Sequence, residues 1–336
     1  MSTDQTAQFE LFGDSSAAMD LIGSVPLPVE LANLPDQLPK RVRFGTSSWS
    51  FPGWAGIVYT KQVGEQLLAR SGLAAYANHP LLRAVGLDRT FYAPLAAAEF
   101  GRYAAAVPED FRFVVKAHAV LTTPPATAQR AAVRADVDRF LDSEYAVSRV
   151  IDPAVEGLGE RLGAILFQFP PLSHSYLRDP RRFAEALGAF LRGLPAGPRY
   201  SVELRNSELL TAEYADVLAS CAVTHCFNVH SRMPNVLEQA KLLGASAWQH
   251  DTIVIRWMLH PTQQYEDARA RYFPFDRIVD SDPANRTAIA RLIETLQTMG
   301  KQVVVIANNK AEGCAPLTLF ALARELGQRA ELALPS

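Results

Sequence analysis

Short apolar runs alternate with longer amphipathic stretches through most of this 336-residue chain. The runs rich in β-branched and aromatic residues predict eight strands, at 42–46, 84–88, 111–117, 164–169, 200–205, 224–229, 252–257 and 302–307. Between them, Ala-, Leu- and Arg-rich stretches predict helices, for example at 95–106, 126–150, 181–191 and 285–299. Continuous apolar runs such as VVVI at 303–306 are typical of strands buried on both faces. The pattern therefore predicts parallel strands joined by crossover helices.

Eight strand–helix units match a TIM (β/α)8 barrel in size and order. A doubly wound open sheet is the alternative, because periodicity does not show whether the sheet closes. Residues 1–40 have little apolar periodicity and carry four prolines in their second half. We therefore expect a flexible arm at 1–40 and a single barrel domain at 41–330.

Composition and charge limit the partners. The chain has 33 Lys and Arg against 35 Asp and Glu, a formal net charge of -2, so we expect no duplex-wrapping nucleic-acid surface and no attraction to membranes. No apolar run approaches the roughly 20 residues of a membrane span, and the first residues lack a secretory signal pattern. Cys221, Cys226 and Cys314 form no CxxC or metal-type cluster, which fits buried positions in a cytoplasmic protein.

Polar residues gather where the predicted strands end, and in either α/β architecture ligands bind at those ends. The candidates are Trp49 after the first strand, Lys116 and His118 at the third, Gln168 at the fourth, Glu203 and Arg205 at the fifth, Arg256 at the seventh, and Asn308 and Asn309 at the eighth. Charged side chains inside a barrel are unfavourable unless they are paired or meet solvent and ligand. We therefore predict a binding site at this end of the barrel.

The charges in this set predict the ligand. Lys116, Arg205 and Arg256 outnumber Glu203, and this local cationic excess favours a small anionic ligand, a phosphate or a carboxylate. Lys116 is a candidate general base or Schiff-base nucleophile, and Glu203 a candidate general acid or base. The alternative is a structural network in which Glu203 neutralises Arg205 or Lys116.

Two further questions stay open from the residues alone. A metal site would use His118, Glu203 and His230, but neighbouring cationic side chains oppose a divalent ion, so we predict no metal and no other cofactor. The loop at 49–54 (WSFPGW) either closes the barrel rim or provides Trp49 or Trp54 as a stacking wall for a ring-bearing ligand.

Several segments, in order, resemble the domain of unknown function 72 family, also called YecE-like. They are 44–54 (FGTSSWSFPGW), 90–92 (TFY), 108–117 (PEDFRFVVKA), 166–171 (LFQFPP), 202–205 (VELR), 308–309 (NN), 312–313 (EG) and 315–316 (AP). The resemblance covers roughly 42–326 and its ordered motifs are specific. It implies a TIM barrel, and its TFY segment adds Tyr92 to the candidate ligand-binding residues. It supplies a fold and a site, and no reaction.

The match has two departures. The family usually has Val-Glu-Ile-Asn-Ser where this chain reads VGLDR at 85–89, and Arg-Leu-His-Gly where it reads RWML at 256–259. Gly86 and Met258 therefore stand in place of a carboxylate and an imidazole. The resemblance thus implies a degenerate or specialised member.

The segment 8–12 (QFELF) resembles the peptide by which bacterial repair and replication proteins dock on the sliding clamp. In such a peptide, Gln8 would hydrogen-bond while Leu11 and Phe12 fill an apolar pocket. The alternative is a short amphipathic segment packed onto the barrel.

Three hypotheses for function follow. The first is a barrel enzyme that binds a phosphate-bearing small molecule or a nucleic-acid end, linked to DNA repair or replication. The second is a non-catalytic accessory protein tethered to the sliding clamp. The third is a metal-dependent barrel hydrolase or isomerase.

Overall fold

Nine strand segments form one parallel sheet in the computed structural model, which describes residues 22–124 and 138–333. They are β1 (Val42–Thr46), β2 (Leu82–Leu87), β3 (Arg112–Lys116), β4 (Leu162–Gln168), β5 (Tyr200–Glu203), β6 (Thr224–His225), β7 (Phe227–Val229), β8 (Thr252–Trp257) and β9 (Gln302–Ala307). Their spatial order is β6-β5-β4-β3-β2-β1-β9-β8-β7. Every predicted strand position is therefore occupied by a strand.

The sheet closes at the sixth predicted strand, 224–229, which is divided into β6 and β7. β6 and β7 stand at opposite ends of the spatial order but follow each other in the chain, separated only by Cys226. β6 pairs with β5 and β7 pairs with β8, while the Cys226 amide donates a 2.8 Å hydrogen bond to the Val202 carbonyl. The structure therefore confirms the TIM barrel and excludes the open sheet.

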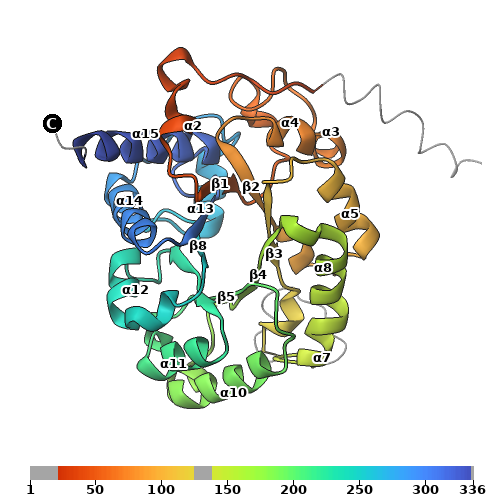
Figure 1. Cartoon of the computed structure of the whole chain (residues 1–336), viewed down its shortest axis with the longest axis vertical. Helices are drawn as coiled ribbons and strands as arrows, with labels where there is room; N and C mark the ends of the chain where they lie inside the picture. Colours follow the sequence, from red (N-terminus) through yellow and green to blue (C-terminus); the bar gives the residue numbers. More distant parts are fainter. Residues whose placement is uncertain (1–21, 125–137, 334–336) are drawn as a thin grey trace, which may run out of the picture.

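Helices surround the barrel (Figure 1). The longer ones are α5 (Ala97–Ala105), α8 (Asp152–Leu158), α10 (Pro180–Arg192), α11 (Ala212–Ser220), α12 (Val236–Leu243), α14 (Pro283–Thr298) and α15 (Ala315–Ala333), with α3 (Glu65–Ser71) and α4 (Leu73–Ala77) after β1 and α13 (Tyr265–Tyr272) after β8. No helix in the described part of the chain has the length and apolar character to cross a membrane.

Two predictions need correction. Residues 126–137 of the helix predicted at 126–150 lie outside the described residues, and residues 138–142 are not helical. α7 (Ser143–Ala146) begins after Asp142, its N-cap, which accepts a 2.9 Å hydrogen bond from the Tyr145 amide. The flexible arm predicted at 1–40 does not extend over residues 22–40, which include a short helix, α2 (Leu34–Gln37), and bury Leu31 and Leu34 against the barrel domain. Residues 1–21 of the predicted arm lie outside the described residues.

The barrel interior is built in layers. Its apolar layer consists of Ala84, Val114, Ala164, Leu166, Cys226, Val254, Val304 and Ile306, all buried. Because alternate residues of a strand face the same side, the residue two positions beyond Val114 also faces inward, and that residue is Lys116. Arg256 likewise faces inward, because it lies two positions beyond Val254 on β8. The fold therefore places a polar layer above an apolar plug, at the C-terminal ends of the strands.

Candidate functional site

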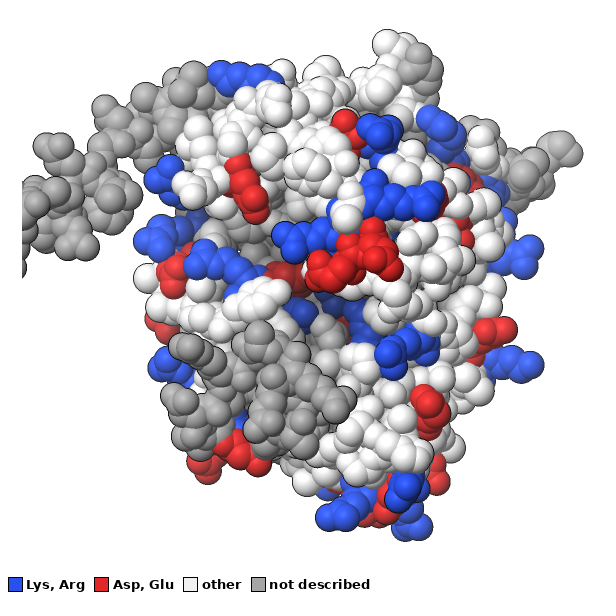
Figure 2. Space-filling model, turned by 180° about the vertical axis from the view of Figure 1, so that it is seen from behind, with Lys and Arg blue, Asp and Glu red and all other residues white. Residues whose placement is uncertain are grey.

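A cavity of about 540 Å³ opens at the C-terminal ends of the strands. Its lining residues are Asp88, Phe91, Tyr92, Lys116, Thr123, Gln168, Pro170, Pro171, Arg205, His230, Arg256, Met258, Leu259, Tyr265, Asn308 and Lys310. Figure 2 shows Lys and Arg side chains in and around a hollow on this side of the molecule, with Asp and Glu side chains at its edge. The volume lies in the range of pockets that hold small ligands.

Glu203 lies beneath the cavity, between two arginines. It is fully buried; one carboxylate oxygen accepts a 2.5 Å hydrogen bond from Nη1 of Arg256, and the other is ion-paired with Nη2 of Arg205. Burial alone would raise the pKa of Glu203, but Arg205 and Arg256 hold it below its ordinary value. Glu203 is therefore an enclosed carboxylate, as the structural-network alternative predicts.

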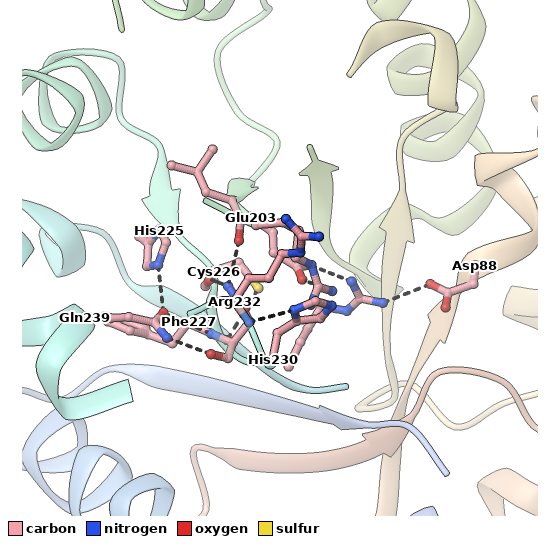
Figure 3. Close-up of polar contacts among 12 residues, drawn as sticks. Asp88, Glu203, His225, Cys226, Phe227, His230, Arg232 and Gln239 are labelled. Atoms are coloured by element: carbon pink, nitrogen blue, oxygen red, sulfur yellow. Dashed lines mark hydrogen bonds and ion pairs between the residues drawn. The ribbon is translucent and has the colours of Figure 1, made fainter. Parts of the chain in front are cut away.

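Arg256 reaches a second carboxylate at the cavity wall. Its Nη2 lies 3.2 Å from Oδ1 of Asp88, the contact drawn beside Asp88 in Figure 3. Burial acts to lower the pKa of Arg256, but Glu203 and Asp88 outweigh it and hold that pKa above its ordinary value. Arg256 is thus a permanent cation fixed on both sides.

Other polar groups at the cavity lack partners. Nη1 of Arg205 and Oγ1 of Thr123 are buried and have no hydrogen-bond partner among the described residues. An unsatisfied buried donor costs free energy unless a ligand or water completes it. Nη1 of Arg205 is therefore a buried donor without a partner, on a side chain that lines the cavity.

Two lysines at the cavity have aromatic neighbours instead of carboxylates. Nζ of Lys116 lies 3.6 Å from the centre of the Phe91 ring, and Nζ of Lys310 lies 4.3 Å from the centre of the Tyr265 ring. Neither lysine forms an ion pair within the described part of the chain. Burial lowers the pKa of each to about 8. Both ammonium groups remain available to an anionic ligand.

The structure brings most of the predicted site residues together. Those that line the cavity are Tyr92, Lys116, Gln168, Arg205, Arg256 and Asn308, with Glu203 directly beneath. Asn308 is held by a 2.8 Å hydrogen bond from its Nδ2 to Oγ of Ser47, and its Oδ1 accepts from the Lys310 amide. The loop after β9 is therefore tied to the end of β1.

Three predicted residues lie away from the cavity lining. Trp49 is buried and donates from Nε1 to the Leu68 carbonyl at 2.9 Å, so it anchors α3. Asn309 accepts from the Ala315 amide at 2.8 Å and from Nε1 of Trp54, which is fully buried. Loop 49–54 therefore closes the rim, and neither tryptophan provides a stacking wall.

His118, the third of these residues, is hydrogen-bonded through Nδ1 to the Tyr145 hydroxyl at 2.8 Å. His230 does line the cavity, and burial together with Arg205 lowers its pKa to about 3. The described residues contain no group of three or more His, Cys, Asp or Glu side chains that could hold a metal ion. The proposed ligand set of His118, Glu203 and His230 is thus not assembled.

Several lining residues were not among the predicted site residues, including Asp88, Phe91, Tyr265 and Lys310. Asp88 ends the second predicted strand and Lys310 directly follows Asn309, so strand-end position was an available signal for both. Tyr265 begins a helix in the loop after β8, and no local pattern points to it. Gln8, Leu11 and Phe12 lie outside the described residues, and docking on a sliding clamp stays a prediction.

Comparison with known proteins agrees with the motifs. The family model described as "Protein of unknown function DUF72" matches residues 43–336. The chain belongs to the DUF72 family. No curated protein matches the sequence.

Two solved DUF72 structures resemble this one in fold. A DUF72 family protein from Enterococcus faecalis V583 is 15% identical, with a TM-score of 0.54 over 88% of this chain and 97% of that chain. A DUF72 family protein from Thermotoga maritima MSB8 is 20% identical, with a TM-score of 0.53 over 85% and 98% of the two chains. At these identities the likeness shows the fold alone.

The two departures from the DUF72 motifs lie at or near the cavity. A Cβ at Gly86 would lie 3.3 Å from the Cα of Ser47, so the backbone of β1 leaves little room for a side chain there. Asp88, two positions further along the chain, begins the turn Asp88–Phe91 after β2 and supplies a carboxylate to Arg256. Met258 lines the cavity as an apolar side chain. The mouth of this DUF72 barrel therefore retains a carboxylate.

Proposed function

We propose that the barrel mouth binds a small anionic ligand, a phosphate-bearing molecule or the phosphate of a nucleic-acid end, and acts on it as an enzyme. The observation that carries this proposal is the charge around the cavity, where four cations face two carboxylates: Lys116, Arg205, Arg256 and Lys310 against Asp88 and Glu203. The excess of positive charge sits in a partly enclosed site, where electrostatic attraction is stronger than in bulk water.

The cations differ in what they offer an anion. Arg205 has its unpartnered Nη1 and a guanidinium suited to phosphate or carboxylate oxygens. Lys116 at the end of β3 and Lys310 in the loop after β9 provide point charges. Gln168 at the end of β4 and Asn308 after β9 are neutral amides that line the same cavity and would orient the ligand.

Lys116 is the best candidate for acid–base chemistry. Its pKa of about 8 leaves a fraction of neutral amine near pH 7, so it can accept a proton at the cavity. Glu203 is fully buried and both of its carboxylate oxygens are ion-paired, one with Arg205 and the other with Arg256. We therefore assign Glu203 a positioning role, which is to hold the two guanidinium groups in place.

Thermal unfolding with inorganic phosphate tests the binding proposal. We expect phosphate to raise the melting temperature of the parent protein through linkage, and Lys116→Met and Lys310→Met to reduce that rise. Lys241→Met is the matched control, because Lys241 is exposed on α12 and does not line the cavity. No rise in the parent, or the same rise in all three variants, would refute the proposal.

Turnover needs a separate measurement. Product formation from a panel of phosphomonoesters and phosphodiesters, lost in Lys116→Met, would support the enzyme. Binding of phosphate without product from any member of the panel would favour the non-catalytic accessory protein.

A further inference from the structure

The rim of the cavity carries two aromatic side chains exposed to solvent. Tyr92 is 79% exposed and Tyr265 is 54% exposed, and both line the cavity. Most large aromatic side chains in the described part of the chain are buried, among them Trp49, Trp54 and Trp257. Exposed aromatic groups beside a concave polar site are typical of surfaces that a ligand covers.

The cavity changes character from floor to rim. Its floor holds the guanidinium groups, with Arg256 2% exposed and Arg205 6% exposed. Its rim holds the rings of Tyr92 and Tyr265. A ligand that fills this space therefore meets positive charge at one end and flat aromatic faces at the other.

Both tyrosines stand on fixed parts of the backbone. Tyr92 follows the turn Asp88–Phe91, where the Thr90 hydroxyl donates to the Leu87 carbonyl and contacts the Lys116 carbonyl, both at 2.5 Å. The Tyr92 ring also meets the Phe91 ring edge to face, with centres 5.6 Å apart. Tyr265 begins α13, and its ring is in contact with the Lys310 ammonium. Little ordering is therefore needed before a ring stacks on them.

We infer that the ligand of this cavity is a nucleotide, whose phosphate binds at the cationic floor and whose base stacks on Tyr92 and Tyr265 at the rim. This inference rests on the proposed function and names its ligand class. Bases stack on aromatic side chains with little dependence on sequence, since every base has a π-face. The nucleotide can come from solution or from the end of a single strand, and both sources present the same chemistry.

Calorimetric titration with adenosine 5′-monophosphate and with ribose 5-phosphate tests the inference. We expect the nucleotide to bind more tightly than the sugar phosphate, because only the nucleotide has a base. Tyr92→Ala and Tyr265→Ala should each weaken nucleotide binding about 5- to 150-fold and leave ribose 5-phosphate unchanged. Tyr92→Phe should retain nucleotide binding, since the ring remains.

Phe273→Ala is the matched control. Phe273 is 73% exposed and lies at the end of α13, but it does not line the cavity. Its removal should leave the binding of both ligands unchanged, which separates stacking at the rim from a general effect of losing an exposed ring.

The outcomes separate the nucleotide inference from the proposal that the cavity binds an anion. Equal affinities for the two ligands, with no effect of either tyrosine variant, would refute nucleotide binding by stacking and leave the proposal of an anion site unaffected. Binding of neither ligand and no response to phosphate would overturn both. If a 5′-phosphorylated trinucleotide binds more tightly than the mononucleotide, the ligand is the end of a single strand. If it does not, the ligand is a free nucleotide. Both results support stacking.

Discussion

Buried cations at this barrel mouth differ in what they do to stability. Arg256 satisfies Glu203 and Asp88, so Arg256→Met would leave a buried carboxylate with one partner fewer. Breaking a buried pair in this way costs about 3–5 kcal/mol. Lys116 has no carboxylate partner, and Lys116→Met removes an ammonium group that burial has already desolvated. We therefore expect Arg256→Met to lower the free energy of unfolding by that amount, and Lys116→Met to leave it unchanged or raise it.

Urea denaturation of both variants at pH 7 measures the difference. Equal losses would mean that Lys116 also belongs to the structural network. Equal stability of the two variants and the parent would mean that the Glu203 pairs contribute nothing to the fold.

At this scale, strand-end position predicted the site residues better than residue type did. Lys116, Arg205 and Arg256 lie together because the C-terminal ends of parallel strands meet at one rim of the barrel. Trp49 and Asn309 lie in loops, where the direction of a side chain depends on the path of the backbone, and both turn to structural hydrogen bonds. Tyr265 comes to the cavity through the loop after β8, which no local pattern describes.

At the scale of elements, the sixth strand is held from behind by a buried polar network (Figure 3). Gln239 on α12 accepts from the Asn228 amide at 3.2 Å and donates to the Asn228 carbonyl at 2.6 Å. It also bonds His225 at 3.1 Å, whose other ring nitrogen meets the Tyr214 hydroxyl at 2.9 Å. Burial lowers the pKa of His225 to about 4, so this ring is neutral at pH 7. The network satisfies backbone groups beside the interruption between β6 and β7.

We expect Gln239→Ala to destabilise the barrel by at least about 2 kcal/mol, because each buried polar group left unsatisfied costs about 1–3 kcal/mol. Leu242→Ala on the same helix is the control, since Leu242 is 56% exposed and should change little. Chemical denaturation of both variants checks this. A loss no larger for Gln239→Ala than for Leu242→Ala would contradict a role of the network in holding the strand.

The order of the elements was predictable, and the network behind the sixth strand was not. Alternation of apolar runs and amphipathic stretches predicted the barrel and all strand positions, since each signal is local. At the interruption at Cys226, β6 and β7 are held by side chains of the flanking helices α11 and α12, and such side-chain contacts are not encoded in the alternation of apolar and polar positions. Within the described residues, the helix start at Ser143 has a local cause, the Asp142 cap, and a capping residue inside an apolar pattern was the signal overlooked.

At the scale of the whole molecule, a slightly acidic chain has a cavity with an excess of cationic side chains. The formal net charge is -2, yet the cavity gathers cations from β3, β8 and the loops after β5 and β9 onto one face. Parallel closure produces this result, because it brings the C-terminal ends of all strands to the same rim. Composition therefore excludes a surface that attracts polyanions everywhere and is compatible with a local anion site.

The two lysines give anion binding a defined pH dependence. With pKa values of about 8, Lys116 and Lys310 are charged at pH 7 and lose their charge as the pH rises toward 9. Sulfate is a suitable probe because its own charge is constant over this range. We expect the rise in melting temperature caused by sulfate to shrink between pH 7 and pH 9, leaving a remainder from Arg205 and Arg256.

Without an anion, the titration of these two lysines makes the folded state more stable as the pH rises. Their pKa values are lower in the folded state than the ordinary 10.5, so between about pH 8 and 10.5 the unfolded chain binds more protons than the folded one. Their contribution to the free energy of unfolding therefore rises with pH across that window. The double variant Lys116→Met, Lys310→Met should lose both trends. A sulfate effect that persists undiminished at pH 9 in the parent would show that the arginines alone bind the anion, because only their charge is constant across the titration.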